Sequence, residues 1–190
     1  MEAFLIGASL GFWAGVSPGP LLAFVLREAL QKGPRAGIMA ALAPLVSDSW
    51  AVALAWLLAG ALPTPLLGAL SKAGGLYLIY LGLAGLLHGA RSPAPEQSGL
   101  ASLRGAVLTN LTNPHMYVFW FAVGGPLLRK LGRAGSWFLL GFFVLIVASK
   151  SGLALLAAAL RSGKVGALLA PLSDVFLLAI GLYLLLAFRV

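Results

Sequence analysis

Residues 4–26 read FLIGASLGFWAGVSPGPLLAFVL and contain no charged side chain. A helix that crosses a bilayer needs about 20 mostly apolar residues, so this stretch is long enough to span one. The run Pro18-Gly19-Pro20 interrupts it well inside its ends. Each proline removes a backbone N–H and bends or breaks a helix. The stretch therefore predicts a transmembrane helix that is broken within the bilayer.

Five further apolar runs follow in the 190-residue chain. They cover residues 36–62, 73–87 (with 66–72 as its first turns), 103–128, 134–160 and 165–188. Hydrophobic residues make up 61% of the chain and charged residues 9%, whereas about a quarter of an ordinary soluble domain is charged. This composition excludes a soluble fold. It predicts an all-α membrane protein with six transmembrane helices, forming a single transmembrane domain over residues 1–190.

The charge pattern argues against nucleic acid as a partner. The net charge is +8, but the basic residues fall singly or in small groups between the apolar runs, as in the loops of a membrane protein. Loops after the first, third and fifth runs carry seven basic residues and those on the other side five, which favours both termini outside. With no cysteine and two histidines, the chain offers little for a metal site, and we expect no metal and no cofactor.

Short motifs recur in the same order in the two halves of the chain. They are RAG at 35–37 and 133–135, SDS at 47–49 with SKS at 149–151, LS at 70–71 and 172–173, and GLYL at 75–78 and 181–184. Each half holds three apolar runs, and because three is odd, the second half must enter the bilayer from the opposite side. The pattern predicts an inverted repeat of two three-helix halves, 1–90 and 103–190, joined by a polar linker over 91–102.

The second half is interrupted where the first half is. The fourth run contains NLTNPH at residues 110–115, where Pro114 leaves the carbonyl of Asn110 without its usual helical donor. A single proline would be read as an ordinary kink, but a matched pair of broken spans points to a transport site. We therefore predict broken helices 1 and 4. Their breaks are formed by Pro18, Gly19, Pro20 and Pro114, with Asn110, Asn113 and His115 as candidate binding residues.

Two charged residues, Asp48 and Lys150, are predicted to be the only ones deep in the bilayer, at equivalent positions of the two halves. A charge at the centre of a membrane helix costs about 2.5–3.5 kcal/mol on insertion scales, so these two require a reason. They could form a structural ion pair. Alternatively, they could bind a zwitterion, with its ammonium group toward Asp48 and its carboxylate toward Lys150. Ser47 and Ser149 adjoin the charges and could hydrogen-bond them or their own helices.

Small and aromatic residues mark surfaces rather than sites. Gly7, Gly11 and Gly15 form a smooth stripe that lets another helix approach closely, either within the bundle or in a homodimer. The five tryptophans are scattered, and we expect most of them to face lipid or the membrane interface.

Taken together, these motifs resemble the lysine-exporter (LysE/RhtB-type) amino-acid efflux family. The resemblance rests on GVSPGP at 15–20, GPRAG at 33–37, Asp48, KAGGLYLIYLG at 72–82, TNLTNP at 109–114 and Pro126. It implies a six-span protein of the cytoplasmic membrane that exports amino acids and related metabolites. The chain departs from the family pattern at His115, where the family usually has a lysine after Asn-Pro, and at Lys150 in the fifth run.

The expected function is a secondary transporter that exports amino acids or similar zwitterions by alternating access, with a proton or sodium ion as a candidate coupling partner. An ion or metal-cation transporter of the same architecture is the alternative, weakened by the single midplane acid and the absence of thiols. An enzyme is disfavoured, because the chain has neither a Gly-x-Ser-x-Gly nor a His-Glu-x-x-His motif.

Overall fold

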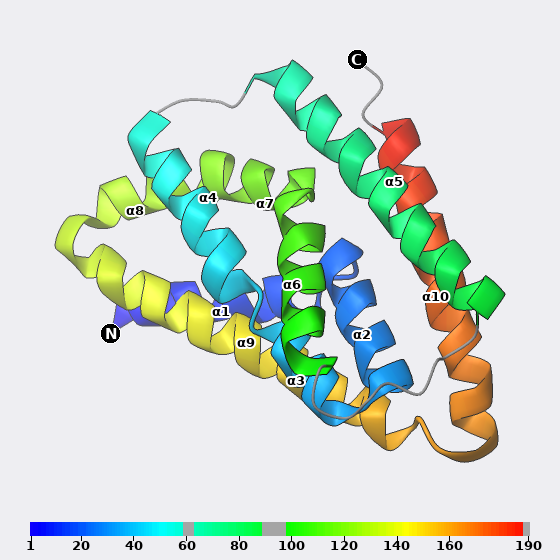
Figure 1. Ribbon diagram of the computed structural model, residues 1–190. Helices are drawn as coiled ribbons and strands as arrows, with labels where there is room; N and C mark the ends of the chain where they lie inside the picture. The colour runs from blue at the N-terminus through cyan, green and yellow to red at the C-terminus, as the bar shows by residue number, and fades with distance from the viewer. Residues whose placement is uncertain (59–62, 89–97, 188–190) are drawn as a thin grey trace.

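The computed structural model describes residues 1–58, 63–88 and 98–187, and all regular structure in these residues is helical (Figure 1). The first apolar run forms two helices, α1 (Glu2–Val16) and α2 (Pro20–Lys32), with their axes bent by 62°. The predicted break in the first span is confirmed. It arises where Pro18 and Pro20 cannot donate to the preceding turn.

The second run is also divided, which we did not predict. It forms α3 (Pro34–Ala41) and α4 (Pro44–Leu58). Pro44 has no N–H for the carbonyl of Ala40, which instead accepts a tight-turn hydrogen bond from the N–H of Ala43 at 3.1 Å. Residues 34–58 still form one candidate span. The predicted last residues of this run, 59–62, lie outside the described residues.

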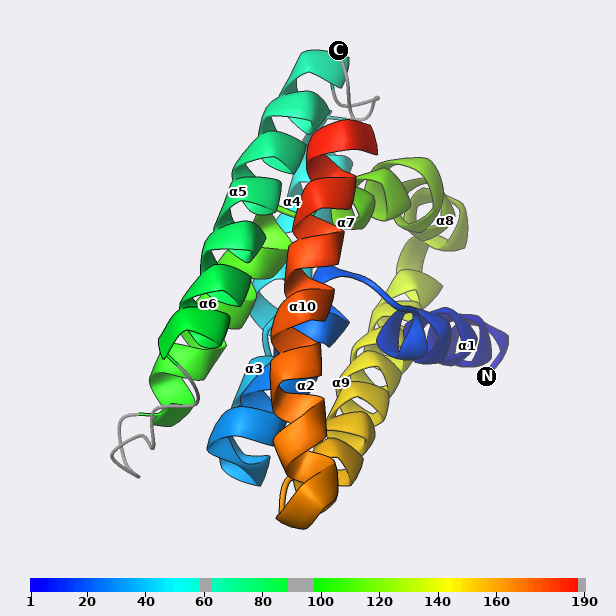
Figure 2. The ribbon, with the colours of Figure 1, turned by 90° about the vertical axis from the view of Figure 1, so that its right-hand side faces the viewer.

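The third and last runs form two long helices, α5 (Thr64–His88) and α10 (Gly163–Ala187), which pack side by side (Figures 1 and 2). The start of α5 agrees with the prediction that 66–72 supplies its first turns. Gly75 and Gly181 allow the two backbones to approach. A Cβ on Gly75 would lie 2.8 Å from the carbonyl oxygen of Gly181, and one on Gly181 would lie 2.7 Å from that of Gly75.

The fourth run is not one helix. It begins as α6 (Ser98–Leu111) and continues after a break as α7 (Pro114–Phe119), a π-helical turn η1 (Trp120–Gly124) and α8 (Gly125–Leu131). The linker predicted over 91–102 lies mostly outside the described residues, at 91–97, and its last residues, 98–102, form the first turn of α6. The division of the chain by this linker stays a prediction.

The chain then reverses at Gly132, whose φ of +52° is a conformation that favours glycine. A short 3₁₀ turn, η2 (Gly132–Ala134), leads into α9 (Gly135–Ala159), which runs back beneath α7 and α8 in Figure 1. Within the described residues, four helical stretches are long and apolar enough to cross a membrane, and the bent α1/α2 pair is a fifth candidate. A multi-pass, all-helical membrane architecture is therefore confirmed. The division into six spans requires α6 and α7–α8 to act as one broken span, and it stays a prediction.

The glycine stripe of α1 is covered by α9 of the same chain. A Cβ on Gly7 would lie 2.0 Å from the carbonyl oxygen of Phe138, and one on Gly11 would lie 2.2 Å from that of Phe142. The predicted homodimer through the face of Gly7, Gly11 and Gly15 is therefore wrong for this structure, because α9 already occupies the face. The alternative of close packing within the bundle is the observed one.

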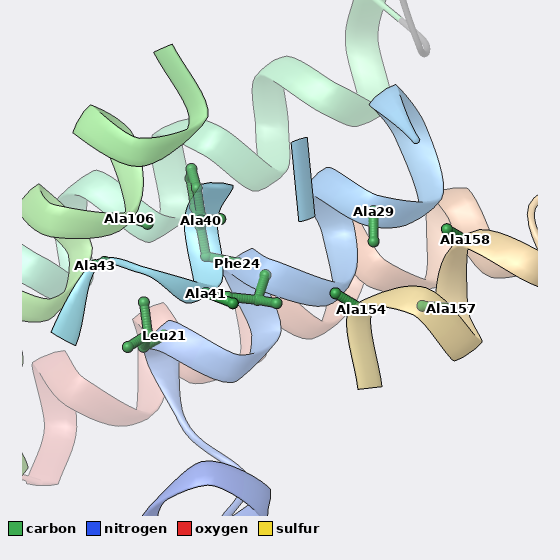
Figure 3. Close-up of a cluster of buried hydrophobic side chains, with 11 residues drawn as sticks. Leu21, Phe24, Ala29, Ala40, Ala41, Ala43, Ala106, Ala154, Ala157 and Ala158 are labelled. Atoms are coloured by element: carbon green, nitrogen blue, oxygen red, sulfur yellow. The ribbon is translucent and has the colours of Figure 1, made fainter. Parts of the chain in front are cut away.

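Helix α2 lies in the interior and packs against α3, α6, α9 and α10. Its apolar side chains Leu21, Phe24 and Val25 meet small residues of its neighbours (Figure 3). The neighbours contribute Ala40, Ala41, Ala43, Ala106, Ala154, Ala157 and Ala158. Alanine at these positions lets the helices pack closely around α2, so the end of α2 at the break is held in place.

Candidate functional site

The first break exposes the carboxyl end of α1 to a charged side chain. Nζ of Lys150, on α9, donates to the carbonyl oxygens of Ala14 and Gly15, both at 3.2 Å. Ala14 is the residue whose carbonyl Pro18 leaves without a helical donor. Lys150 therefore satisfies the carbonyl groups freed by the break, and its positive charge complements the negative end of the α1 dipole.

The second break is closed by its own side chains. The Oδ1 atom of Asn113 caps α7 by accepting a hydrogen bond from the N–H of His115 at 3.1 Å. The hydroxyl of Tyr117 donates to the carbonyl oxygen of Leu111, the last residue of α6, at 2.9 Å. The helix ends at this break therefore have hydrogen-bond partners despite their depth in the bundle.

Asp48 lies at the start of α4 and is buried among donors. Its Oδ1 atom accepts a hydrogen bond from Nδ2 of Asn110 at 2.6 Å, and its Oδ2 atom accepts one from Nε1 of Trp120 at 3.1 Å. Asn110 also donates to the hydroxyl of Ser47 at 2.8 Å, while that hydroxyl donates to the carbonyl oxygen of Ala43 at 2.9 Å. Within the described residues, the contacts of this carboxyl group are therefore neutral hydrogen-bond donors and not a cation.

Asp48 and Lys150 do not pair with each other. No ion pair joins them in the described part of the chain. Asp48 accepts hydrogen bonds from Ser47, Asn110 and Trp120, whereas Lys150 donates to the α1 carbonyl oxygens. The structural ion pair considered from the sequence is therefore wrong for this conformation. Backbone carbonyls at the break offered Lys150 a partner that the sequence pattern did not reveal.

Both charges nevertheless line one cavity of about 570 Å³, which lies at the two breaks. Predicted residues that line it are Pro18, Gly19, Pro20, Asp48, Asn110, Asn113, His115 and Lys150. The volume lies in the range of roughly 300–1,000 Å³ usual for small-molecule sites. The cavity also reaches Trp13 and Tyr183, which are 70% and 56% exposed, so it meets the molecular surface on that side.

The structure separates the remaining predicted residues. The hydroxyl of Ser47 lies within hydrogen-bond distance of Oδ1 of Asp48. Pro114 is the first residue of α7 and does not line the cavity. Ser149 does not join the site. Its hydroxyl donates to the carbonyl oxygen of Leu145 at 2.6 Å, within its own helix, as the alternative reading of the serines allowed. The ring of His115 lies nearly parallel to that of Tyr183, with the ring centroids 6.4 Å apart.

Sequence reasoning missed two features. Trp120 is fully buried on Asp48, although we expected most tryptophans to face lipid or the interface. Nothing in the sequence separates it from exposed tryptophans such as Trp137. The prediction that only Asp48 and Lys150 are buried charges is also wrong, because Arg27, Glu28 and Asp174 are buried too. The charge of Asp174, inside an apolar run, was the signal that could have revealed this second cluster.

The fold and the site together define a multi-span helical membrane protein with a polar cavity at paired helix breaks. The sequence profile of the LysE type translocator family matches residues 12–187, and the chain belongs to this family. It is a transporter and not an enzyme, and its family implies the efflux of small molecules such as amino acids.

A curated relative is the chemotactic transduction protein ChpE of Pseudomonas aeruginosa, 32% identical over 139 residues. The matched stretch covers 67% of this chain and 66% of that relative's length. No solved structure matches the chain.

The contact between Trp120 and Asp48 can be tested by itself. Trp120→Phe keeps an aromatic ring but removes the N–H donor, and a hydrogen bond to a charged group contributes about 1.5–3 kcal/mol. We expect the free energy of unfolding, measured by titrating folded protein in mixed micelles with a denaturing detergent, to fall by about that amount. Trp137→Phe, at a site 58% exposed on α9, is the matched control and should change it little. Equal effects of the two variants would contradict the assignment.

Proposed function

We propose that this protein is a secondary exporter of amino acids or related small zwitterions, working by alternating access around the breaks in α1/α2 and α6/α7. The observation that carries the proposal is that a carboxylate and an ammonium group, Asp48 and Lys150, line one cavity without pairing with each other. Two opposite charges separated across a cavity complement a substrate that carries both.

The orientation of the substrate follows from the neighbours of each charge. The substrate's ammonium group would lie toward Asp48. Its carboxylate would lie toward Lys150 and the amino end of α2, where Leu21 and Leu22 also line the cavity. The positive end of the α2 dipole points toward this end of the cavity, and broken helices in transporters place such ends at anionic substrate groups. The substrate carboxylate would then compete with the carbonyl oxygens of α1 for Lys150. Substrate binding in the cavity would therefore be linked to the position of α1.

The inverted repeat, and with it a six-span division, draws support from the contact between α5 and α10. Gly75 and Gly181 belong to the equivalent GLYL motifs, and each lies against the carbonyl oxygen of the other. A two-fold axis carries every residue onto its equivalent, so only residues at the axis can touch their own equivalents. A pseudo-two-fold axis through this contact relates residues 1–90 to residues 103–190 within one transmembrane domain.

Three further points belong to the same proposal. We place the protein in the cytoplasmic membrane because of its family, and both termini outside because of the charges of its loops. A proton or a sodium ion is the coupling partner, and Asp48 is the buried acid in the cavity that either ion would approach.

The test is reconstitution into liposomes loaded with labelled amino acids, with and without imposed proton or sodium gradients. We expect at least one zwitterionic amino acid to leave the vesicles faster than from protein-free vesicles, and one gradient to change that rate. Uptake of a divalent cation with no movement of any zwitterion would replace the proposal by the ion-carrier alternative. A labelled anion without an amino group controls for leak.

A further inference from the structure

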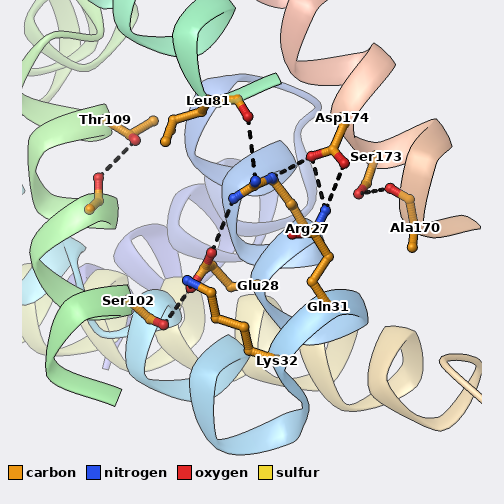
Figure 4. A network of polar contacts seen from close by, with 11 residues as sticks. Arg27, Glu28, Gln31, Lys32, Leu81, Ser102, Thr109, Ala170, Ser173 and Asp174 are labelled. Carbon is orange, nitrogen blue, oxygen red and sulfur yellow. Dashed lines mark hydrogen bonds and ion pairs between the residues drawn. The ribbon is translucent and has the colours of Figure 1, made fainter. Parts of the chain in front are cut away.

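A second polar cluster, buried and separate from the cavity, surrounds the carboxyl half of α2 (Figure 4). Nε of Arg27 contacts Oδ1 of Asp174, on α10, at 2.5 Å, and Nη1 of Arg27 lies 3.3 Å from Oε1 of Glu28. Nη2 of Arg27 also donates to the carbonyl oxygen of Leu81, on α5, at 3.4 Å. One arginine thus joins α2 to both long helices of the α5/α10 pair.

Further contacts join α2 to the rest of the bundle. Nε2 of Gln31 donates to both carboxylate oxygens of Asp174, at 2.9 and 2.8 Å. Nζ of Lys32 lies 2.7 Å from Oε2 of Glu28, and the hydroxyl of Ser102, on α6, donates to the same oxygen. The cluster therefore links α2 to α5, α6 and α10 through two carboxylates.

Burying these charged side chains costs free energy, so we look for a role of the cluster other than stabilising the fold. Replacing a buried ion pair by apolar residues of similar volume is often neutral or stabilising, so such a pair is weak support for a folded state. Charged residues inside membrane proteins mark working parts as a rule. Such a network is stable while every charge has its partner, and losing one partner costs much free energy. It can therefore favour one of two discrete arrangements of packed helices over the other.

The cluster lies at the closed end of the cavity. On α2, the residues that line the cavity end at Leu22. The next turns bury Phe24, labelled in Figure 3, and Val25 in the alanine-rich core. Arg27 and Glu28 follow along the helix (Figure 4). A solute leaving the cavity along α2 would have to separate α2 from α6 and α10, the helices that the cluster holds to it.

The repeat does not reproduce the charges of this cluster in the other half of the chain. The RAG motif, which follows Arg27 and Glu28, recurs 98 residues later, so the counterparts of these two residues are Gly125-Pro126. The LS motif, which precedes Asp174, recurs at a spacing of 102 residues, so the counterpart of Asp174 is Lys72, which is exposed. These three counterparts therefore cannot form an ion-pair cluster among themselves.

We propose that Arg27, Glu28 and Asp174 form a one-sided ionic latch, which closes the α2 end of the cavity and opens once in each transport cycle. The proposal rests on the alternating access proposed above. Because the counterparts in the other half form no such cluster, nothing equivalent ties the helices together where the cavity meets the surface, near Trp13 and Tyr183. The latch biases the empty transporter toward the conformation described here.

Cysteine labelling tests the latch directly, because the natural chain has no cysteine. Ser17→Cys places one thiol in the cavity wall, and a membrane-impermeant thiol reagent is applied to either side of oriented vesicles without substrate. We expect labelling from the open side only. Adding Asp174→Asn should raise labelling from the α2 side by at least about tenfold, since loss of one member of a buried ion pair disfavours the closed arrangement strongly.

A second variant keeps the test decisive if Asp174→Asn fails to fold. Gln31 is partly buried at the edge of the cluster and donates to both carboxylate oxygens of Asp174. Gln31→Ala therefore weakens the cluster while Arg27 still pairs with Asp174, so no buried charge loses its ionic partner. We expect labelling of Cys at position 17 from the α2 side to rise, by less than in Asp174→Asn. Lys164→Gln, at an exposed position of α10, is the control and should leave the labelling unchanged.

Unchanged labelling ratios in both Asp174→Asn and Gln31→Ala, with a lowered melting temperature for Asp174→Asn, would overturn the latch and leave the cluster a structural one. The exchange Arg27→Asp with Asp174→Arg should restore the original ratio if the attraction is what matters. The labelling needs no substrate. It can therefore succeed where the liposome screen finds no transported zwitterion, and the two proposals can fail separately.

Discussion

Asp48→Asn is expected to reduce transport in reconstituted liposomes by at least about 30-fold, since removing one member of a buried charged interaction costs about 2–5 kcal/mol and each 1.4 kcal/mol is a factor of ten. Asparagine has nearly the shape of aspartate but no charge for a substrate ammonium group. Its amide group also carries an NH₂ in place of one carboxylate oxygen. This NH₂ would face Asn110 or Trp120, which both donate to Asp48, so two donors would meet. The loss should appear in the rate of labelled amino-acid efflux.

Lys150→Met is the companion variant on the opposite wall of the cavity. Methionine keeps an unbranched side chain, but it cannot bind a substrate carboxylate or donate to the carbonyl oxygens of Ala14 and Gly15. We expect a loss of efflux comparable to that of Asp48→Asn.

The control is Glu2→Gln, which neutralises an exposed acid at the start of α1 and should leave efflux unchanged. Wild-type efflux from both Asp48→Asn and Lys150→Met would show that the two charges do not form the substrate site. If Glu2→Gln also lost efflux, the loss in the other two variants would come from the change in net charge and not from the substrate site.

Gly11→Ala is expected to have the largest effect on folding. The added methyl group would lie 2.2 Å from the carbonyl oxygen and 2.8 Å from the Cα atom of Phe142. These are backbone atoms inside α9, so relief requires moving a whole helix away from α1. We expect a destabilisation above about 4 kcal/mol, a size reserved for severe overpacking and similar defects. The measurement is the yield of monodisperse protein in detergent and its melting temperature.

Gly152→Ala is the matched control, because the same substitution on α9 meets nothing within 4 Å. Alanine is favoured over glycine in a helix by about 1 kcal/mol, so this variant should be neutral or slightly stabilising. A Gly11→Ala protein that melts like the wild type would mean that α1 and α9 do not pack as closely as described here.

Much of the site could be predicted from the sequence because its signals are local. Proline cannot donate a backbone hydrogen bond, so the breaks at Pro18, Pro20 and Pro114 follow from composition in any helical fold. The repeat then places Asp48 and Lys150 at equivalent depths, and the structure brings both to the same cavity. In contrast, Ser149 turned back to its own helix, which the sequence pattern left open.

The contacts of Trp120 and Asp174 could not be predicted in the same way. Trp120 reaches Asp48 from a π-helical turn, which shifts the face on which the side chain lies. Asp174 meets Arg27 only because α10 crosses α2 at that height, where Gly85 of α5 leaves room for the carboxylate. The charge of Asp174 inside an apolar run signals a buried site, but neither residue type nor spacing reveals which partner Asp174 or Trp120 meets.

Residue types and their order along the chain were enough to predict a helical membrane protein, the places where two of its spans break and the charged pair at equivalent positions. Hydrophobicity and the missing N–H of proline act within one segment, so a single chain displays them directly. Tertiary structure decided which partner each buried charge has: backbone carbonyls for Lys150, amide and indole donors for Asp48, and Asp174 for Arg27. The partner that each buried charge meets depends on how closely two helices pack and on which residues face each other where they cross. Glycine contacts such as Gly11 on Phe142 and Gly75 on Gly181 set that geometry only once the helices have assembled.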